Sequence, residues 1–520
     1  MDNFEKMNKI PEIPKEKFAF AQLDVKLHDK KFETKPIGYF TDAWMRFKKN
    51  KASIAASIII LFVILFAVIA PFISPYEIST NDGVYVKIRP RIDSLASTGF
   101  YNGGMNKKLN DRFLIYYNAI GVAAGHTNDG FGFRTWNSGL ENEYSPLINI
   151  KDEFQEDNKT YRYAEVDSCL EVGFQYLSIT QAQYDEIKRQ EQEMGIQILY
   201  PMVDINNSYC ADPSDANCWY KAASNYMPLD TEDNPMKLRQ VQSNGYIDNY
   251  LRDEDGNVLD YMKKDKTMLQ VRVLYYNYYK MTTGHAPTFY FGTDAQGYDI
   301  FTRLAYGSRL SLLLAASVSI LNFIIGSIYG SIEGFYGGAV DIVMERIVDI
   351  LDGLPFIVVA TLFNLHLVKT GIVSAFTGIL FAFVLTGWTG IAYRVRTQFY
   401  RFKKQEFVLA ARTLGASDAR LMFKHIFPNS LGTIITSAAL VIPGTILSES
   451  TLSYLGIFNF NGQNMTSLGT LLGNGQGYLA TDPHIILFPC ITISLLMISF
   501  NLFGNGLRDA FNPSLRGVDD

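Results

Sequence analysis

Long apolar segments alternate with polar ones along the chain, and several are long enough to cross a lipid bilayer. A helix of about 20 residues spans the roughly 30 Å hydrocarbon layer. Four segments contain no charged residue, namely residues 52–70, 310–332, 371–393 and 485–507. A fifth, residues 431–448, is apolar up to Glu449. These five segments predict membrane-spanning helices.

A sixth segment, residues 341–368, begins with Asp and Glu residues and ends in the apolar run LPFIVVATLFNLHLV. We interpret it as a span that is entered from a polar side. Six spans place both ends of the chain on the same face. Residues 1–51 precede the first span and Pro71 follows it, which favours an uncleaved span over a signal peptide.

Lys and Arg residues beside the spans predict the orientation, because short loops that carry them stay in the cytoplasm. With six spans, three basic clusters fall on one face: Arg46, Lys48, Lys49 and Lys51; Arg394, Arg396, Arg401, Lys403 and Lys404; and Arg508 and Arg516. We therefore expect a multi-pass plasma-membrane protein with both termini in the cytoplasm.

The first two spans are separated by residues 73–285, which the predicted orientation places outside the cytoplasm. The stretch VRVLYYNYYK is typical of a β-strand, while TQAQYDEIKRQEQEMG has the Thr cap, charged helix formers and terminal Gly of a helix. We therefore expect an α+β insertion. It is acidic, as is the chain with its formal net charge of −5. It contains no nucleophile elbow or His-Glu-x-x-His motif, so we expect no enzyme there.

The four cysteines leave the redox chemistry of the insertion open. Cys169, Cys210 and Cys218 lie in it, and Cys490 lies in the last span. An oxidising exterior permits a Cys210–Cys218 disulfide that closes a small loop, and three unpaired cysteines are the alternative. No Cys-x-x-Cys or His pair accompanies them, so we expect no metal site.

Residues 406–429, EFVLAARTLGASDARLMFKHIFPN, lie between the fourth and fifth spans and predict two short helices joined at a glycine. Gly415 stops the first helix, Ser417 or Asp418 caps the second, and Pro428 ends it. One apolar stripe recurs at helical spacing: Phe407, Ala410, Ala411 and Leu414. Such a stripe needs a partner, which is either the chain's own bundle or a separate subunit.

This stretch resembles the EAA loop of permease subunits of ATP-binding-cassette importers. The pattern is Glu-Ala-Ala, three residues, Gly, and a hydrophobic-Pro ending. Leu409 replaces the Glu of the motif and Phe427 its usual Leu, and Glu406, one turn earlier, partly substitutes for the missing acid. The resemblance implies that a loop at 401–430 couples the chain to an ATPase through Glu406, Phe407, Ala410, Ala411, Leu414, Gly415, Ile426 and Pro428.

A second stretch, FGTDAQGYDIFTRLAYGSRLS at 291–311, is similar to the Gly-Thr-Asp-x-x-Gly-Arg-Asp signature of the C-type permeases of oligopeptide, dipeptide and nickel importers. Tyr298 replaces the Arg of that signature. Thr293 or Asp294 is expected to cap a helix that forms an amphipathic interfacial segment. We expect this segment to be architectural. The matching residues are Gly292, Thr293, Asp294, Gly297, Asp299, Arg303, Tyr306, Gly307 and Arg309.

The ending FNLFGNGLRDAFNPSLRG is similar to the C-terminus of the same family. The resemblance implies an all-α polytopic membrane protein with six transmembrane helices and a large α+β extracytoplasmic insertion between the first two. The expected organisation is an N-terminal segment 1–51, a first span 52–72, the insertion 73–285, an interfacial segment 286–309, a permease core 310–507 and a tail 508–520.

The chain contains no Gly-x-x-x-x-Gly-Lys-Ser/Thr loop, so we expect it neither to bind ATP nor to be an enzyme. The resemblance implies a complex in membrane lipid with a second, B-type permease, two cytoplasmic ATPases that hold ATP and Mg, and an extracytoplasmic peptide-binding lipoprotein. Closure of the ATPases would tilt the spans on either side of the loop. We expect no cofactor, metal or nucleic acid on this chain.

Charged residues at membrane depth are further candidates for function. Glu345, Arg346, Asp349 and Asp352 have helical spacing and predict ion pairs among themselves. Glu449 has no partner nearby in the sequence, and our hypothesis is that it faces the translocation pathway or the outer vestibule. An isolated His366 favours an interfacial position over a metal site.

Transport of oligopeptides is the function these motifs favour, and the substrate itself is not encoded in them. An importer of dipeptides or nickel is one alternative. A membrane-anchored extracytoplasmic receptor or enzyme is another, and an ion-coupled transporter, which should show inverted repeats, is a third. The loop at 401–430 argues against the last two. We also hypothesise that the acidic insertion docks the lipoprotein.

Overall fold

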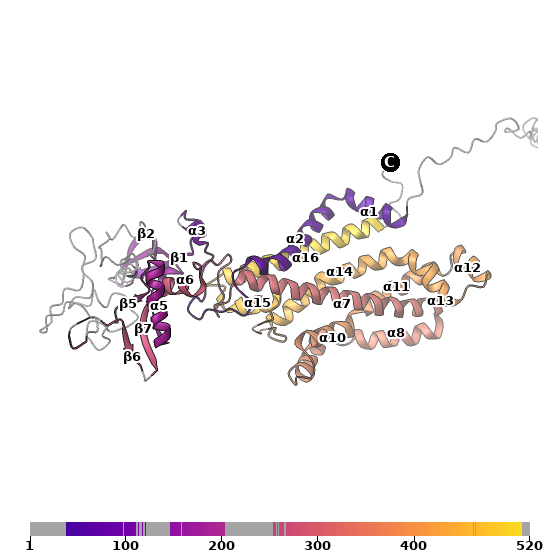
Figure 1. The fold of residues 1–520 in the computed structure, drawn as a ribbon. Coiled ribbons are helices and arrows are strands. Elements are labelled where there is room, and N and C mark those ends of the chain that lie inside the picture. Colours follow the sequence, from indigo (N-terminus) through magenta and orange to yellow (C-terminus); the bar gives the residue numbers. More distant parts are fainter. Residues whose placement is uncertain are drawn as a thin grey trace, which may run out of the picture.

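A bundle of long helices and a strand-containing unit lie end to end in the computed structural model (Figure 1). The structure describes residues 38–110, 146–202 and 253–511, apart from positions 97, 158, 256, 258, 265, 266, 461 and 463, together with Phe113, Tyr117 and Ile120. Cys210 and Cys218, and with them the predicted disulfide, lie outside the described residues.

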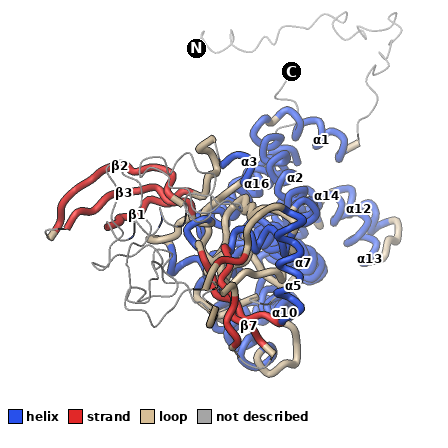
Figure 2. The backbone as a smooth tube through the Cα atoms, turned by 60° about the vertical axis from the view of Figure 1, so that its left-hand side comes forward, coloured by secondary structure: helices blue, strands red, loops and turns tan. Residues whose placement is uncertain are grey.

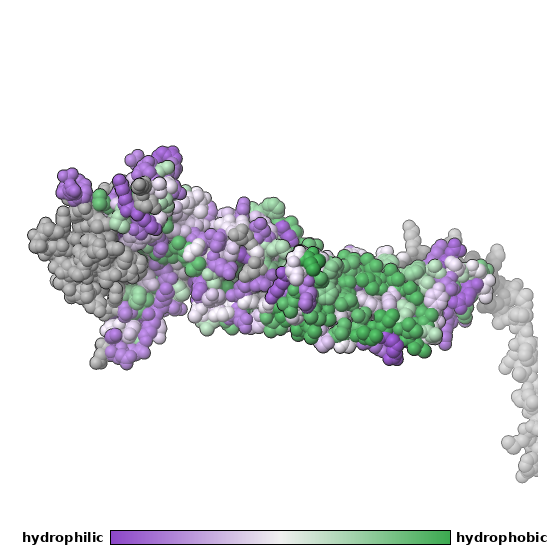
Figure 3. Space-filling view, turned by 90° about the horizontal axis from the view of Figure 1, so that it is seen from below, coloured by the Kyte–Doolittle hydropathy of each residue, from purple (hydrophilic) through white to green (hydrophobic). Residues whose placement is uncertain are grey.

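Five helices of the described chain are long and apolar enough to cross a membrane, which confirms five of the predicted spans. They run over Lys51–Ile73 (α2), Ile300–Tyr336 (α7), Ala375–Phe402 (α10, Ala375–Gly387, with α11, Thr389–Phe402), Asp418–Tyr454 and His484–Phe511 (α16). Their outer faces expose large apolar side chains, and Figure 3 shows a hydrophobic surface over the bundle and a hydrophilic one over the strand-containing end.

The segment predicted as the third span is broken. Gly338–Asp352 (α8) and Phe356–Val368 (α9, Phe356–Phe363, with a π-helical turn, Asn364–Val368) meet at an angle of 73°. Pro355 caps α9 and explains the break, because proline has no N–H to donate and disfavours the helical conformation of the residue before it. The described helices thus give five spans, or six if the bent pair crosses the membrane as one span.

The predicted interfacial segment at 286–309 is not a separate element. Helix α7 begins at Ile300 and continues without interruption into the span, so its first turns belong to the same helix. Its N-cap is Asp299, whose side chain accepts a hydrogen bond from the Thr302 N–H at 2.8 Å. The prediction that Thr293 or Asp294 caps this helix was wrong.

Two antiparallel sheets form the strand-containing unit and confirm the expected α+β insertion (Figure 2). One has the order β1-β3-β2, from Gly104–Asn110, Lys159–Asp167 and Leu147–Glu156. The other has the order β4-β7-β5, with β6 also paired to β7, from Phe174–Thr180, Met268–Leu274, Leu199–Tyr200 and Tyr261–Lys263.

Among the described residues of this unit, α-helices lie at Asp93–Ala96 (α3), Gln181–Met194 (α5) and Tyr275–Thr283 (α6). The expected helix begins at a capping box formed by Thr180 and Gln183 and ends at Gly195, as predicted. The stretch VRVLYYNYYK is a strand only as far as Leu274, and its tyrosines belong to α6.

Close helix packing within the bundle depends on a glycine stripe of α7. Gly326, Gly330 and Gly334 recur every fourth residue and lie against α11. A Cβ on Gly326 would lie 2.7 Å from the Trp388 carbonyl oxygen, and one on Gly330 would overlap the Ala392 carbonyl. Small residues at this spacing let two membrane helices approach closely.

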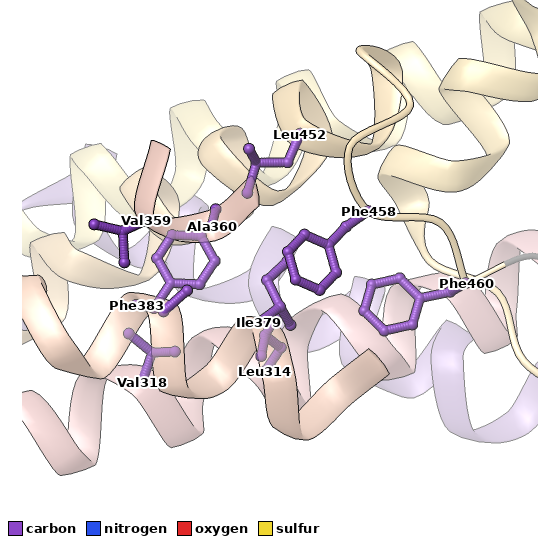
Figure 4. Close-up of a cluster of buried hydrophobic side chains, with 10 residues drawn as sticks. Leu314, Val318, Val359, Ala360, Ile379, Phe383, Leu452, Phe458 and Phe460 are labelled. Carbon is purple, nitrogen blue, oxygen red and sulfur yellow. The ribbon is translucent and has the colours of Figure 1, made fainter. Parts of the chain in front are cut away.

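The bundle interior contains several apolar clusters. Figure 4 shows one cluster in which side chains from four helices and the segment after α14 (Phe427–Tyr454) meet: Leu314, Val318, Val359, Ala360, Ile379, Phe383, Leu452, Phe458 and Phe460. Helix α1, Tyr39–Lys49, packs beside the end of α16 through Phe47, which contacts Phe503 edge to face at 5.5 Å between ring centroids.

Candidate functional site

The predicted two-helix element forms as a hinge segment, residues 406–428, at the end of the bundle away from the sheets (Figure 1). Its helix α12 covers Glu406–Thr413, and a turn of α13 at Asp418–Arg420 leads through a π-helical stretch, Leu421–Ile426, into α14. Gly415 lies between α12 and α13 with a φ of +83°, a conformation that favours glycine.

The second helix of the hinge segment agrees with the prediction at its start and differs from it at Pro428. Ser417 is the residue that caps α13, as one alternative had it, although its side chain makes no capping hydrogen bond. Pro428 does not end the second helix, because it lies in the first turn of α14, where its missing N–H costs no hydrogen bond. The hinge segment therefore passes directly into a spanning helix.

One face of the hinge segment is anchored in the chain's own bundle. Val408, Leu421 and Ile426 are fully buried and pack with Phe335 of α7 and Phe399 of α11. Ile426 was expected to contact a partner subunit, and its burial corrects that expectation. The hinge segment is thereby packed against α7, α11 and α14 through buried side chains.

The opposite face is apolar and exposed. Leu414 has 89% of its surface exposed, Phe407 41% and Leu409 47%. Glu406, Ala410, Gly415 and Pro428 are also exposed, whereas Ala411 is half-buried against the bundle. The four residues of the predicted stripe therefore do not share one environment. Phe407, Ala410 and Leu414 face outward, and Ala411 faces the bundle. The stripe analysis missed Leu409 and Phe423, the latter 47% exposed, and Leu409 was read only as a departure from the EAA pattern.

An ion network lies behind the hinge segment. Arg396 of α11 forms salt bridges with Asp341 and Glu345 of α8 at 2.6 and 3.1 Å and with Glu333 of α7 at 3.4 Å. Glu345 thus pairs with another helix, contrary to prediction, and the expected pairing within α8 is confirmed for Arg346 and Asp349, at 2.7 Å. The network ties the broken span to two straight ones.

The signature segment ties the chain after α2 to the start of α7. The Thr293 hydroxyl donates to the Tyr85 carbonyl at 2.7 Å and accepts from the Ile88 N–H at 2.8 Å. Gly292 and Gly297 have φ near +80° and leave no room for a Cβ, because the Ile88 and Asp82 carbonyl oxygens would overlap it. Close backbone contact therefore explains why glycine stands at both positions.

The other signature residues also make internal contacts. The Asp294 carboxylate accepts from the Gln296 and Tyr298 N–H groups at 2.8 and 3.0 Å, which forms a tight turn. The buried guanidinium of Arg303 lies 4.1 Å from the centroid of the Tyr298 ring. Gly307 lies against the backbone at the start of α15 (Leu468–Gly475). The Arg309 guanidinium donates to the Ala67 carbonyl oxygen. These contacts support the architectural interpretation.

Glu449 is fully buried within the bundle. Its carboxylate accepts hydrogen bonds from Ser467 at 2.6 Å and from Ser311 and Ser453 at 3.1 Å. The hypothesis that it faces the pathway or the vestibule was wrong, because partners distant in sequence satisfy the carboxylate. Glu449 instead joins α14 to α7 and α15. Cys169 is buried and free, and Cys490 is exposed and free.

A bundle of spanning helices that buries one face of a helical hinge segment and exposes the other is typical of a membrane transport subunit. Two family models match the chain. The binding-protein-dependent transport system inner membrane component matches residues 322–517, and the N-terminal TM domain of oligopeptide transport permease C matches residues 38–90.

Curated relatives agree with these matches. The oligopeptide transport system permease protein OppC of Bacillus subtilis is 42% identical over 44% of this chain and 72% of its own length. The dipeptide transport system permease protein DppC of the same organism is 39% identical over 44% of this chain and 69% of its own length. OppC of Escherichia coli K12 is 35% identical over 45% of this chain and 74% of its own length.

The chain therefore belongs to the family of binding-protein-dependent transport system inner membrane components. It is a multi-pass inner-membrane permease subunit and not an enzyme. Membership also implies a transporter complex with other subunits. The two matched ranges leave residues 91–321, which include most of the insertion, between them.

Proposed function

We propose that this chain translocates oligopeptides across the cytoplasmic membrane by alternating access, driven by ATP hydrolysis in partner subunits. Two of the three relatives named above are oligopeptide permeases, and the B. subtilis OppC has the highest identity of the three. A dipeptide importer is the alternative that the DppC match supports. None of the three relatives named above is described as a nickel permease.

The exposed apolar face of the hinge segment carries the proposal. Exposed apolar patches on a soluble surface mark sites of protein association. Phe407, Leu409 and Leu414 form such a face, while Val408 on the other side is buried in the bundle. The occupant is one of two cytoplasmic ATPases that hold ATP and Mg. A second, B-type permease completes the pathway, and an extracytoplasmic lipoprotein delivers the peptide.

The proposed orientation rests on the Lys and Arg clusters beside the spans. The hinge segment and both termini face the cytoplasm, and residues 73–285 lie outside, as the Lys and Arg clusters predict. Closure of the ATPases would move α12, and the buried contacts of Val408, Leu421 and Ile426 would pass that movement to α7, α11 and α14. Each state then needs different contacts with the ATPase, since equal contacts would shift no equilibrium.

Uptake assays test the substrate. In cells that lack this chain, expression of the full-length protein is expected to restore uptake of a radiolabelled pentapeptide. An inhibitor that depletes cellular ATP, such as azide, is expected to abolish that uptake. Labelled dialanine and ⁶³Ni²⁺ are measured in parallel. Restoration of dialanine or Ni²⁺ uptake without pentapeptide uptake would contradict the proposal.

A further inference from the structure

We propose that a cavity of about 340 Å³ between the insertion and the start of α7 binds a primary ammonium group, R–NH₃⁺, through the Asp299 carboxylate and aromatic walls. Its lining combines the segment after α2, helix α6 and the signature segment, and includes Tyr76, Asp82, Tyr279, Phe289 and Asp299. The inference is independent of the proposed function and concerns the end of the molecule opposite the hinge segment.

Asp299 supplies an unused hydrogen-bond acceptor. Its Oδ2 accepts from the Thr302 N–H at 2.8 Å and from the Thr302 hydroxyl at 2.6 Å. Its Oδ1 is buried and accepts no well-aligned hydrogen bond in the described part of the chain, where only the Phe301 N–H also lies near the carboxylate. The residue is only 4% exposed. Buried acceptors are normally satisfied, so an N–H donor from a ligand fits this position.

The charge of the cavity favours a cation. Two carboxylates, Asp82 and Asp299, line it, and none of the described lining residues is Lys or Arg. Asp82 is already held by the Tyr275 hydroxyl at 2.7 Å and the Val84 N–H at 2.8 Å. The N-terminus of α7 contributes only about half a positive charge, so the two carboxylates leave the cavity negative.

The walls suit an ammonium group rather than a hydrated metal ion. Tyr76 stacks on Phe289 at 5.1 Å between ring centroids, and the Tyr279 hydroxyl donates to the Tyr76 oxygen at 3.1 Å. Aromatic faces attract cations, and the attraction grows when water is excluded. Thr80, Thr282 and Thr283 add hydroxyl groups at the rim.

A ligand bound in the cavity would contact three parts of the chain. Asp299 caps α7, while Tyr279 lies on α6 and Tyr76 follows α2. An ammonium ion between them would contact the insertion and two spanning helices together. Its binding is therefore expected to stabilise the junction between the insertion and the bundle.

Calorimetric titration of the full-length chain in lipid nanodiscs tests the site. Burial raises the pKa of the Asp299 carboxyl to about 6, so a titration near pH 8 keeps it ionised and ordinary histidines neutral. Propylammonium is the probe, tetramethylammonium tests the need for an N–H donor, and propanol tests the need for charge. K⁺ at equal ionic strength tests selectivity. Triglycine separates a peptide amino terminus from a small amine, and its affinity is referred to its protonated fraction, which is about half near pH 8. The ammonium form that binds more tightly then identifies the source.

Variants assign the binding to Asp299. Asp299→Asn keeps a good helix cap and is expected to weaken propylammonium binding at least roughly tenfold, as for loss of a charged hydrogen bond. Asp294→Asn is the matched control, because that neighbouring carboxylate does not line the cavity, and it is expected to bind as the unaltered chain does. Phe289→Leu removes one aromatic wall and provides a second test if Asp299→Asn does not fold.

Binding of propylammonium by the unaltered chain, its loss in Asp299→Asn and its weakening in Phe289→Leu would support the site. Absence of binding would overturn the proposal. Equal affinity for tetramethylammonium, propanol or K⁺ would do so too, and so would unchanged affinity in a folded Asp299→Asn variant.

Discussion

Replacement of Gly330 by leucine is expected to prevent the bundle from folding. The glycine lies against α11, and even a Cβ would overlap the Ala392 carbonyl oxygen, which is backbone and cannot rotate away. Ordinary overpacking costs about 1–3 kcal/mol, and here four additional carbon atoms must enter an occupied space. Fluorescence-detected size-exclusion chromatography of the detergent-solubilised chain is expected to show aggregate in place of a single peak.

Gly390→Leu is the matched control for this variant. Gly390 lies on α11 as well, but a Cβ there would meet no atom within 4 Å. The control is expected to elute as the unaltered chain does. A Gly330→Leu chain with the same elution profile as the control would show that α7 and α11 are not packed through the glycine stripe.

Gly415→Glu is expected to abolish peptide uptake while leaving the chain folded in the membrane. The positive φ costs a non-glycine residue about 1–2 kcal/mol, but a Cβ at this position enters open space. The fold therefore survives. The new charge lies beside the exposed Leu414, and burial of an unpaired charge in an interface costs several kcal/mol. Each loss of about 1.4 kcal/mol in binding free energy weakens association with the partner about tenfold. Uptake is therefore expected to fall at least roughly tenfold.

Gly415→Asn separates backbone strain from charge. Asparagine tolerates the left-handed conformation and carries no charge, so this variant is expected to retain most of the uptake. Uptake is measured with the labelled pentapeptide at equal membrane levels of each chain. Equal losses in both variants would attribute the defect to the turn alone, and normal uptake by Gly415→Glu would remove the hinge segment from the coupling mechanism.

Hydropathy alone predicted five spanning helices, because each contains an apolar stretch of at least 18 residues. Local signals were equally informative at α5, where the Thr180 cap and the Gly195 stop are both read within a few residues. The break at Pro355 was overlooked because an apolar run continues through it. In each case the signal lay in the sequence of one element.

Features that depend on two distant elements were harder to predict. Glu449 looked isolated because its serine partners Ser311 and Ser467 come from other segments. The glycines of α7 can be recognised as packing positions only once α11 is known to lie beside them. In the hinge segment, helical spacing identified an apolar stripe, but only packing shows that Leu414 faces outward and Ile426 inward. The free carboxylate oxygen of Asp299 likewise follows from tertiary contacts.

The most direct test of the account is affinity purification of the tagged chain from its native membrane in mild detergent, beside a Leu414→Asp variant. Leu95→Asp is the control, because it places the same charge at an exposed leucine of the insertion. Mass spectrometry is expected to find ATPase subunits and a second permease with the unaltered chain and the control, and to find only the permease with Leu414→Asp. ATPase subunits retained at full yield by Leu414→Asp would contradict docking at the hinge segment.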